Sequence, residues 1–500
     1  MAKNFHGRMK KGFDPVITEY LVGPEIKDDV EHKFQVFVDV NKAHVLMLAK
    51  QGIIKEDVAK KILEVADEMG RMGDKPSFNI DLTAEDIYVN LERYLVEKTS
   101  LDIGGQQHTA RSRNDLYAAT TRMALRRPYL RICEDFLELR QTLIELAAKN
   151  ADAVFSGYTH LQPSEPTTFG HYLSGVLAAM ERDFKRVAAV YETINTSPMG
   201  AGSMGSTTWP IDRQMVCDFL GFDKIMDNSI DCVASRDFAT EFLAALSIAA
   251  VTISRFCFDL HVWSTPDFGY VEVDDSCAGC SSIMPQKKNP FTLEHVKAKA
   301  AHIEGFLVSA LNCQKNTPFT NCQDVGTESV AYLWKAVEEM ECMLKVLKVT
   351  AAGITLHREK MISTAQSNFC TVTELANYLV RKDGISFRMA HELVAMVVDY
   401  MITHQLRANE ITAAILNELY VKMFNRTTTM TDEDIQAALD PVANLKLRKL
   451  PGGPSPEEVL RQLKARQSVL DLDRELTGKR SEMLDAAKTK LEEAVADFIR

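Results

Sequence analysis

The fold is decided by residues 237–263, which read DFATEFLAALSIAAVTISRFCFDLHVW. Apolar side chains recur along this stretch at alternating spacings of three and four, the pattern of a helix that buries one face. The residues of this apolar seam are Ala239, Phe242, Leu246, Ala249, Ile253, Phe256, Leu260 and Trp263. At about 1.5 Å of rise per residue, the seam predicts a helix more than about 35 Å long.

Three more apolar seams with similar spacing flank this one. Their residues are Tyr129, Ile132, Phe136, Leu139, Leu143 and Leu146; Leu293, Val296, Ala300, Ile303, Leu307 and Ala310; and Leu333, Ala336, Met340, Met343 and Leu347. No comparable set of alternating strand patterns or Asn-Gly hairpin turns is present. Several long seams in one chain predict an all-α fold built on a bundle of long antiparallel helices. Such seams serve either an intramolecular core alone or a subunit interface as well, and we expect an oligomer.

The chain divides into three predicted domains around this bundle. Residues 1–111 form an N-terminal domain with shorter helical stretches, and residues 112–360 form the central long-helix domain. Residues 361–500 form a C-terminal helical domain with shorter helices and more turns. Its charged tail, residues 467–500, carries Leu and Ala at helical spacing and predicts an extra C-terminal helix.

Composition excludes several classes of protein. The net charge of −11 over 500 residues argues against a nucleic-acid partner, because such surfaces need a basic excess. No uninterrupted run of about 18 apolar residues is present, so no membrane span is expected. The N-terminal MAKNFHGRMKKGF lacks the apolar core of a signal peptide. Ten scattered cysteines in a long chain without a secretion signal indicate a reduced, cytoplasmic protein.

Only Cys277 and Cys280 form a CxxC pair. A structural zinc site needs about four ligands, and neither a second CxxC nor a nearby histidine pair accompanies this one. We therefore expect no metal and no cofactor.

Polar segments rich in Gly or Pro interrupt the helices. The first is GGQQHTARSRND, residues 104–115, which places Ser112, Arg113 and Asn114 before a long helix. Arginine offers a planar fork of donors to a carboxylate, and a helix N-terminus attracts anions. The same residues also suit an ordinary helix cap, and the pattern does not choose between these two interpretations.

The second polar segment is SGYTHLQPSEPTTFGHY, residues 156–172, where Thr159, His160 and Gln162 lie together. A histidine in an irregular segment between helices can titrate near neutral pH and act as an acid or a base. A lone histidine is more often structural, so His160 carries both interpretations.

The third polar segment is DDSCAGCSSIMPQKKNPFTLEH, residues 274–295, a long non-periodic stretch between two apolar seams. Adjacent Ser281 and Ser282 precede Lys287 and Lys288. Lysines and a following helix N-terminus supply positive potential, a setting in which a serine alkoxide could act as a base. The alternative is a structured, solvated basic loop.

Three stretches together resemble the motifs of the fumarase/aspartase superfamily. CSSIMPQKKNP at 280–290 is similar to the signature GSSxMPxKxNP, and its QKKN form is similar to the argininosuccinate lyase branch. HTARSRND at 108–115 resembles HTGRSRND, and the segment from 157 to 172 resembles GYTHLQ with its proline-containing sequel.

Three weaker similarities extend the resemblance over about residues 10 to 460. EDIYVNLERYL at 85–95 resembles EDIHxxxExxL, with Tyr88 where His is usual. SRDF at 235–238 resembles ERDF, and GGPSPEEV at 452–459 resembles GGTAPxxV.

The resemblance implies three mostly helical domains whose long helices form a twenty-helix core in a homotetramer, with each active site built from three subunits. It also implies anti elimination of fumarate from a succinyl group through an aci-carboxylate carbanion. Donors must be preorganised toward the carboxylate on which charge accumulates. The partners implied are therefore an N-substituted aspartate and fumarate.

Position by position, the resemblance assigns Ser281 as the base and His160 as the acid, oriented by Glu294. Lys287 and Asn289 bind the carboxylate that becomes charged. The remaining substrate-binding positions are Ser112, Arg113, Asn114, Thr159, Gln162, Ser282 and Met284. The choice of Ser281 over Ser282 follows the family pattern alone.

The departures from the branch pattern fall on the amine side of the site. Where argininosuccinate lyases carry YNKDLQEDK against the arginine moiety, this chain reads NCQDVGTES, so Tyr, Gln and Lys become Asn321, Gly326 and Ser329. A serine expected after the N-terminal Asp-Pro falls at Gly23.

Three smaller departures affect other motifs. Gln107 and Ala110 replace a Lys and a Gly. Cys280 replaces the Gly of the signature, and we expect this change to alter the mobility of the loop, because Gly permits backbone angles that Cys does not.

These departures lead to one main hypothesis. The fumarate side is kept and the amine side is rebuilt, so the substrate is expected to be an aspartate N-linked to something other than arginine, of the ethylenediamine-disuccinate type for example. The alternatives are an authentic argininosuccinate lyase and a non-catalytic crystallin-like member. A fumarase and an adenylosuccinate lyase fit the motifs less well.

Overall fold

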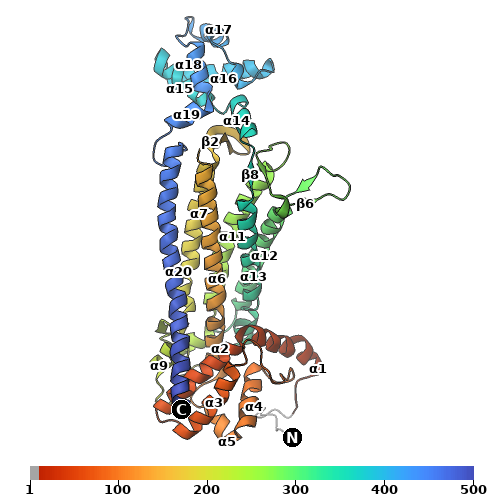
Figure 1. The fold of residues 1–500 in the computed structure, drawn as a ribbon, viewed down its shortest axis with the longest axis vertical. Coiled ribbons are helices and arrows are strands. Elements are labelled where there is room, and N and C mark those ends of the chain that lie inside the picture. The colour runs from red at the N-terminus through yellow and green to blue at the C-terminus, as the bar shows by residue number, and fades with distance from the viewer. Residues whose placement is uncertain (1–10) are drawn as a thin grey trace.

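The computed structural model describes residues 11–500. The molecule is elongated, with long helices side by side in its middle and a group of shorter helices at each end (Figure 1). The prediction of a mostly helical fold is confirmed.

Five long helices make the central bundle: α6 (Arg113–Lys149), α7 (Phe169–Ala189), α11 (Asp237–Trp263), α12 (Phe291–Gln314) and α13 (Leu333–Ala352). Helix α11 packs against α7 and α12, while α13 packs against α6 and α12. All eight residues of the seam in α11 are buried, so the periodicity identified the core face correctly.

Helix α11 is also apolar enough to need comment. Among the described residues it is the one helix whose length and mean hydropathy of 1.6 would by themselves suit a membrane span. Ser247, Thr252 and Ser254 interrupt its apolar run, which is why the sequence predicts no membrane span there. This helix lies in the bundle, and 56% of its most apolar stretch is buried there, as in the core helix of a bundle.

Shorter elements close the lower end of the bundle in Figure 1. They are α1 (Pro15–Ile17), η1 (Thr18–Val22), α2 (Gly23–Lys50), α3 (Glu56–Gly70), α4 (Ile87–Lys98), α5 (Leu101–Gly104), η2 (Gly105–His108), α8 (Tyr191–Ile194), α9 (Arg213–Phe219), α10 (Ser229–Ala234) and η4 (Asp324–Glu328).

A second group caps the upper end and has a hydrophobic core of its own. Its elements are α14 (Arg358–Ser367), α15 (Val372–Asp383), α16 (Phe387–Thr403), η5 (Ala408–Glu410), α17 (Ala413–Phe424), α18 (Asp432–Leu439) and α19 (Pro441–Leu447). The domain boundaries at residues 111 and 360 stay a prediction.

Short strands, which the sequence did not predict, join the helices in pairs. The pairs are β1 (Val154–Thr159) with β2 (Gln162–Thr168), β3 (Thr196–Ser197) with β4 (Lys224–Ile225), β5 (Val271–Glu272) with β8 (Thr355–Leu356), and β6 (Gly279–Cys280) with β7 (Lys288–Asn289). A short 3-10 turn, η3 (Asp275–Cys277), precedes β6. Only the β3–β4 pair is parallel.

The C-terminal helix α20 (Pro456–Ile499) runs back along the bundle to the lower end (Figure 1). Ser455 caps its first turn and Pro456 occupies the first helical position, where a missing N–H costs nothing. Leu463, Leu470 and Leu484 are buried against the bundle. The predicted extra helix is therefore the last part of a 44-residue helix.

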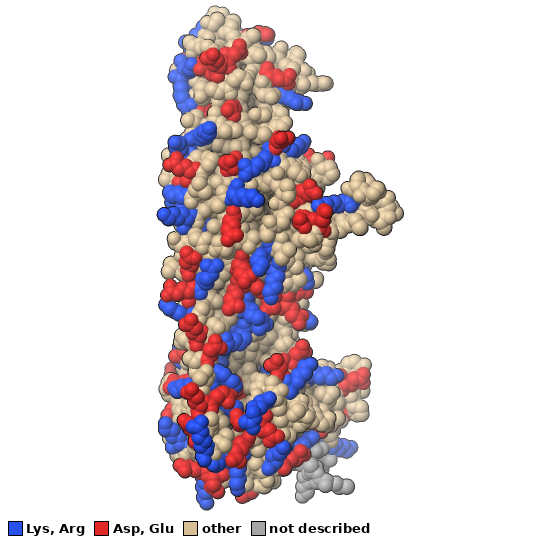
Figure 2. All heavy atoms as spheres, viewed as in Figure 1, with Lys and Arg blue, Asp and Glu red and all other residues tan. Residues whose placement is uncertain are grey.

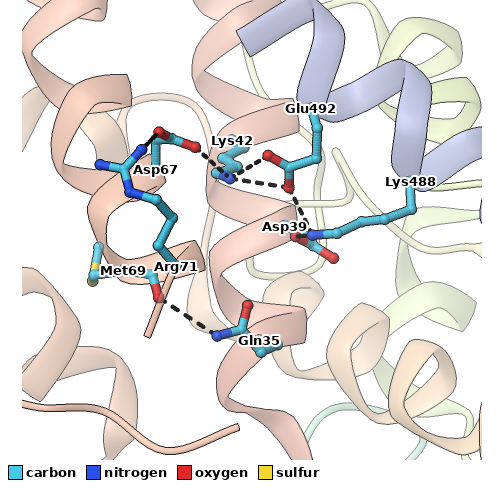
Figure 3. A network of polar contacts seen from close by, with 8 residues as sticks. All are labelled: Gln35, Asp39, Lys42, Asp67, Met69, Arg71, Lys488 and Glu492. Carbon is cyan, nitrogen blue, oxygen red and sulfur yellow. Dashed lines mark hydrogen bonds and ion pairs between the residues drawn. The ribbon is translucent and has the colours of Figure 1, made fainter. Parts of the chain in front are cut away.

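A network of ion pairs connects the C-terminal part of α20 to the N-terminal helices α2 and α3 (Figure 3). Lys42 of α2 is almost completely buried, and its Nζ lies 2.7 Å from Glu492 Oε2 and 3.3 Å from Asp67 Oδ1. Lys488 of α20 pairs with Asp39 and Glu492. Because Lys42 is desolvated, its charge is tolerated only while these carboxylates face it.

We expect Lys42→Met to lower the free energy of unfolding by about 2 kcal/mol, because Glu492 and Asp67 lose their buried charge-assisted partner and keep only the more exposed Lys488 and Arg71. Denaturant unfolding followed by circular dichroism measures this loss. Lys479→Met is the matched control, because within residues 11–500 the one ion pair of Lys479 is an exposed pair with Glu475, on the same helix as Glu492. Equal effects of the two substitutions would contradict a role for burial at Lys42.

Candidate active site

The N-terminus of α6 is built by a capping box. Ser112 Oγ accepts a hydrogen bond from the Asn114 N–H at 3.2 Å, and Ser112 N–H donates to Asp115 Oδ1 at 3.1 Å. Asp115 Oδ2 also accepts from Gly200 N–H and Gly202 N–H, at 3.1 and 2.9 Å. Burial raises the Asp115 pKa to about 6 despite these bonds. The polar segment at 104–115 is thus a helix cap that also holds a loop in place.

Arg113 and Asn114 are already engaged within the chain. Arg113 Nη1 lies 2.6 Å from Asp86 Oδ2 and its Nη2 lies 2.9 Å from Glu85 Oε1. Asn114 donates to the Ser203 carbonyl at 3.0 Å. The predicted binding of the succinyl group by Arg113 would therefore compete with two carboxylates.

Two of the sequence departures, Ala110 and Tyr88, lie at or next to the segment before α6. Ala110 has a φ of 63°, in the left-handed region where the family's glycine fits without strain. Tyr88 lies between the Arg111 guanidinium, 5.6 Å from its ring, and the His108 ring at 5.2 Å. Burial and the charge of Arg111 lower the His108 pKa to about 4.

Asn321, Ser329 and Gly23, which replace residues of the argininosuccinate lyase pattern on the amine side, lie in different surroundings. Asn321 Nδ2 donates to Asn114 Oδ1 at 3.1 Å, so it lies at the N-terminus of α6. Ser329 is fully buried and bonded to the Val325 carbonyl at 2.8 Å. A Cβ added to Gly23 would lie 2.8 Å from the Thr18 carbonyl oxygen of the π-turn η1, so serine does not fit there without a shift.

His160 lies at the tip of the β1–β2 hairpin. Thr159 pairs with Gln162, which leaves His160 and Leu161 as a two-residue turn, each with a φ of 56°. This left-handed conformation is usual for asparagine or glycine and is strained for His160 and Leu161. Backbone strain of this kind recurs at functional sites. Thr159, His160 and Gln162 are all exposed at this tip.

Residues 279–289, which contain most of the signature motif, form an arm that projects from the bundle. Strands β6 and β7 pair at its base, and Figure 1 shows the arm projecting sideways. In Figure 2 it is a knob with a mostly uncharged outer part and charged side chains where it joins the body. Ile283 is 83% exposed and Met284 39% exposed. These are large apolar side chains that the protomer itself does not cover.

Ser281 differs from Ser282 in its surroundings. Ser281 Oγ accepts hydrogen bonds from the N–H groups of Met284 at 3.0 Å and Ile283 at 3.4 Å. No such bond reaches Ser282 Oγ from the residues between 11 and 500, and its side chain is exposed.

The cations of the arm also differ. Lys288 pairs with Glu272 at 2.9 Å and Asp275 at 2.6 Å. Lys287 is exposed and forms no ion pair within the part of the chain that the structure describes. Asn289 lies at the base of the arm, in β7. Lys287 is therefore the cation of this arm that is available to a substrate.

Glu294 lies in the first turn of α12, 3.8 Å from His261 Nε2. Its predicted partner His160 is not among its contacts in the protomer. A pairing of Glu294 with His160 would need a second subunit.

The three polar segments are not brought together within the protomer. Ser112 and the hairpin lie at opposite ends of α6, whose 37 residues span roughly 55 Å. Among the described residues, no hydrogen bond or ion pair links the N-terminus of α6, the hairpin and the arm. Beside the hairpin lies a cavity of about 1200 Å³, which Thr159, His160, Tyr158, Arg255 and Trp263 help to line. Each segment is thus presented on a different part of the surface.

The chain is similar to known proteins over almost its whole length. Residues 25–305 match a family model described as "Lyase", and residues 369–446 match one described as "Argininosuccinate lyase C-terminal". The chain is 42% identical over 494 residues to "Argininosuccinate lyase 1" of Shouchella clausii (strain KSM-K16), covering 99% of both chains. It is 34% identical to the argininosuccinate lyase of Methanothermobacter thermautotrophicus, over 94% of this chain and 99% of that one.

The chain belongs to the argininosuccinate lyase branch of the fumarase/aspartase superfamily. This lyase is a carbon–nitrogen lyase that releases fumarate. A solved structure of EDDS lyase in complex with formate is similar to it, with a TM-score of 0.88, 29% identity and coverage of 98% of this chain and 96% of that one. A class II fumarase from Schistosoma mansoni shares the fold alone, with a TM-score of 0.67 and 15% identity over 82% of this chain and 91% of that one.

Some residues beside the α6 N-terminus were missed by the sequence argument. Glu25 of α2 and Thr327 of η4 are in contact there, with Thr327 Oγ1 3.1 Å from Glu25 Oε1. Asp86, the N-cap residue of α4, pairs with Arg113 but was not predicted as a site residue. A carboxylate on an amphipathic helix looks like a solvated residue in the sequence, so no pattern signalled these contacts.

Proposed function

We propose that this lyase eliminates fumarate from an N-substituted L-aspartate whose amine is not arginine. Ser281 removes the Cβ proton, and the electron pair passes into the adjacent carboxylate as an aci-carboxylate. The Cα–N bond then breaks while His160, oriented by Glu294, protonates the leaving nitrogen. Lys287 and Asn289 bind the carboxylate on which negative charge accumulates, because fixed donors at that point lower the barrier.

The two backbone N–H groups that point at Ser281 Oγ support its role as the base. Hydrogen bonds to the charged form of a group favour that form, so they stabilise an alkoxide at Ser281 more than one at Ser282. An unpaired Lys287 on the same arm adds to this effect. Thr159, Gln162, Ser112, Asn114, Ser282 and Met284 would complete the contacts to the succinyl portion.

We also propose that the active form is a homotetramer with composite sites. The supporting observation is the distance between the segments in one protomer, together with apolar side chains left exposed on the bundle. Ile248, Val251 and Phe258 of α11 and Val308 and Leu311 of α12 are each between 44% and 56% exposed. Apolar faces of this kind are usual at obligate interfaces.

The proposal of an altered substrate is carried by the surroundings of Asn321 and Ser329. The Asn321 amide is bonded to Asn114, and the buried Ser329 hydroxyl is bonded within the chain. Neither residue offers the charge or the reach of the Tyr and Lys expected there. A site that lost such partners should reject the old substrate.

Argininosuccinate should therefore be turned over poorly. We expect its kcat/KM to be at least about a hundredfold below that of the best N-substituted aspartate in a panel that includes ethylenediamine disuccinate. Fumarate release, followed by its ultraviolet absorbance, measures both values. Argininosuccinate turnover as fast as the best alternative would favour the authentic argininosuccinate lyase, which the 42% identity to a protein of that name supports.

A further inference from the structure

The amine side of the site is bounded by a ring of polar contacts at the N-terminus of α6. The Asn321 side chain donates a hydrogen bond to Asn114. Arg113, which precedes Asn114 in the chain, forms an ion pair with Asp86. Six residues after Asn321, Thr327 binds Glu25. Helices α2, α4 and α6 and the turn η4 therefore meet at one place.

Charge in this ring is unevenly balanced. Asp29, one turn after Glu25 on α2, is 2% exposed. Its Oδ1 lies 2.7 Å from Lys33 Nζ, and its Oδ2 has no hydrogen-bond partner in the described part of the chain. Asp86 and its neighbour Glu85 share Arg113. Four carboxylates thus face two cations.

Among the described residues, Glu25 is the carboxylate of this ring that forms no ion pair; Lys33, which pairs with Asp29, acts on it only through its charge. Within residues 11–500, the one side-chain contact of Glu25 is the Thr327 hydroxyl, which also lies 2.8 Å from Gln323 Oε1. Burial and the neighbouring Asp29 raise the Glu25 pKa above its usual value, which marks a site that would gain from a positive charge.

Space is available beside Thr327, the residue that contacts Glu25. Gly326 precedes Thr327, and a Cβ added to it would meet only Asn321 Oδ1, at 3.6 Å.

We propose that Glu25 recognises a positive charge on the amine that leaves, so that the substrates are N-succinyl derivatives of cationic amines such as diamines. This inference rests on the proposed function and narrows it. Amines that end in a carboxylate and carry no second cation are disfavoured, because they would approach an excess of negative charge. Glu25 is thus a specificity-determining residue.

The test uses the reaction in its reverse direction, the addition of simple amines to fumarate. Ethylenediamine, propylamine and β-alanine differ in one end group, which is positive, neutral or negative. We expect ethylenediamine to be added at least about tenfold faster than propylamine at equal, subsaturating concentrations of free amine, and β-alanine to be slowest. The N-substituted aspartate formed is quantified by mass spectrometry.

Variants locate the effect at Glu25. Glu25→Gln keeps the bond from Thr327 and should abolish the preference for ethylenediamine over propylamine, while Glu25→Lys should favour β-alanine. Glu31→Gln is the matched control, because Glu31 lies exposed on the same helix. Its preference should equal that of the wild type.

The outcomes separate the two proposals. If the wild type forms or cleaves N-substituted aspartates without regard to the charge of the amine, or if Glu25→Gln keeps the preference, the role of Glu25 is overturned and the proposed function stands. If no N-substituted aspartate is formed or cleaved under any condition, the proposed function falls and the inference falls with it.

Discussion

Replacing Ser281 with alanine is expected to lower fumarate release by about a thousandfold or more, because the elimination loses the group that takes the Cβ proton. The readout is kcat on the best N-substituted aspartate, with a circular dichroism spectrum to show that the fold is intact. Ser281 lies on an arm outside the bundle, so the substitution should not change the unfolding midpoint.

Ser282→Ala is the matched control for this experiment. Ser282 is adjacent and exposed, but it lacks the two N–H donors that reach Ser281 Oγ. We expect it to keep kcat within about tenfold of the wild type. The reverse ranking of the two serines would assign the base to Ser282. Wild-type protein that releases fumarate from no N-substituted aspartate would instead favour the crystallin-like alternative.

Mixing two inactive variants is expected to restore activity. If Ser281 and His160 reach one site from different subunits, hybrids of Ser281→Ala and His160→Asn contain some sites with both residues intact. Random assortment in a tetramer leaves about a quarter of the sites complete. Co-expression of the two variants, followed by the fumarate assay, measures the recovery.

The control for this mixing experiment pairs two substitutions on the same arm, Ser281→Ala and Lys287→Met. Every arm in such hybrids carries one defect, so no activity should return. A failure of Ser281→Ala and His160→Asn to complement each other in a verified hybrid tetramer would show that one subunit supplies both residues. A monomeric active enzyme would contradict the composite site directly.

Local features of the chain were predictable because they depend on nearby residues. The spacing of apolar residues identified the buried face of α11, and Ser112 suited a helix cap that the structure contains. The turn at His160 was not predicted, because neither His160 nor Leu161 is a residue type that favours a φ of 56°. The hairpin forms there although its turn lacks the usual sequence signal.

The partners of the candidate site residues depended on the path of the chain. Arg113 was predicted to bind a carboxylate of the substrate. In the structure it forms ion pairs with Asp86 and Glu85, which lie just before α4. Lys42 is a charged residue of α2 that is nevertheless buried, and its partner Glu492 comes from the far end of the sequence. Contacts between residues that are hundreds of positions apart leave no trace in local periodicity.

By itself, the sequence determined the helical bundle and the family, and it predicted the residues that carry the elimination, because periodicity and short motifs are properties of consecutive residues. Only the tertiary structure decided where those residues lie. A 37-residue helix separates Ser112 from the hairpin that carries His160, and the arm carries Ser281 away from the bundle. Only the tertiary structure also brought Glu25 to Thr327, because two helices and a turn that are distant in sequence pack together there.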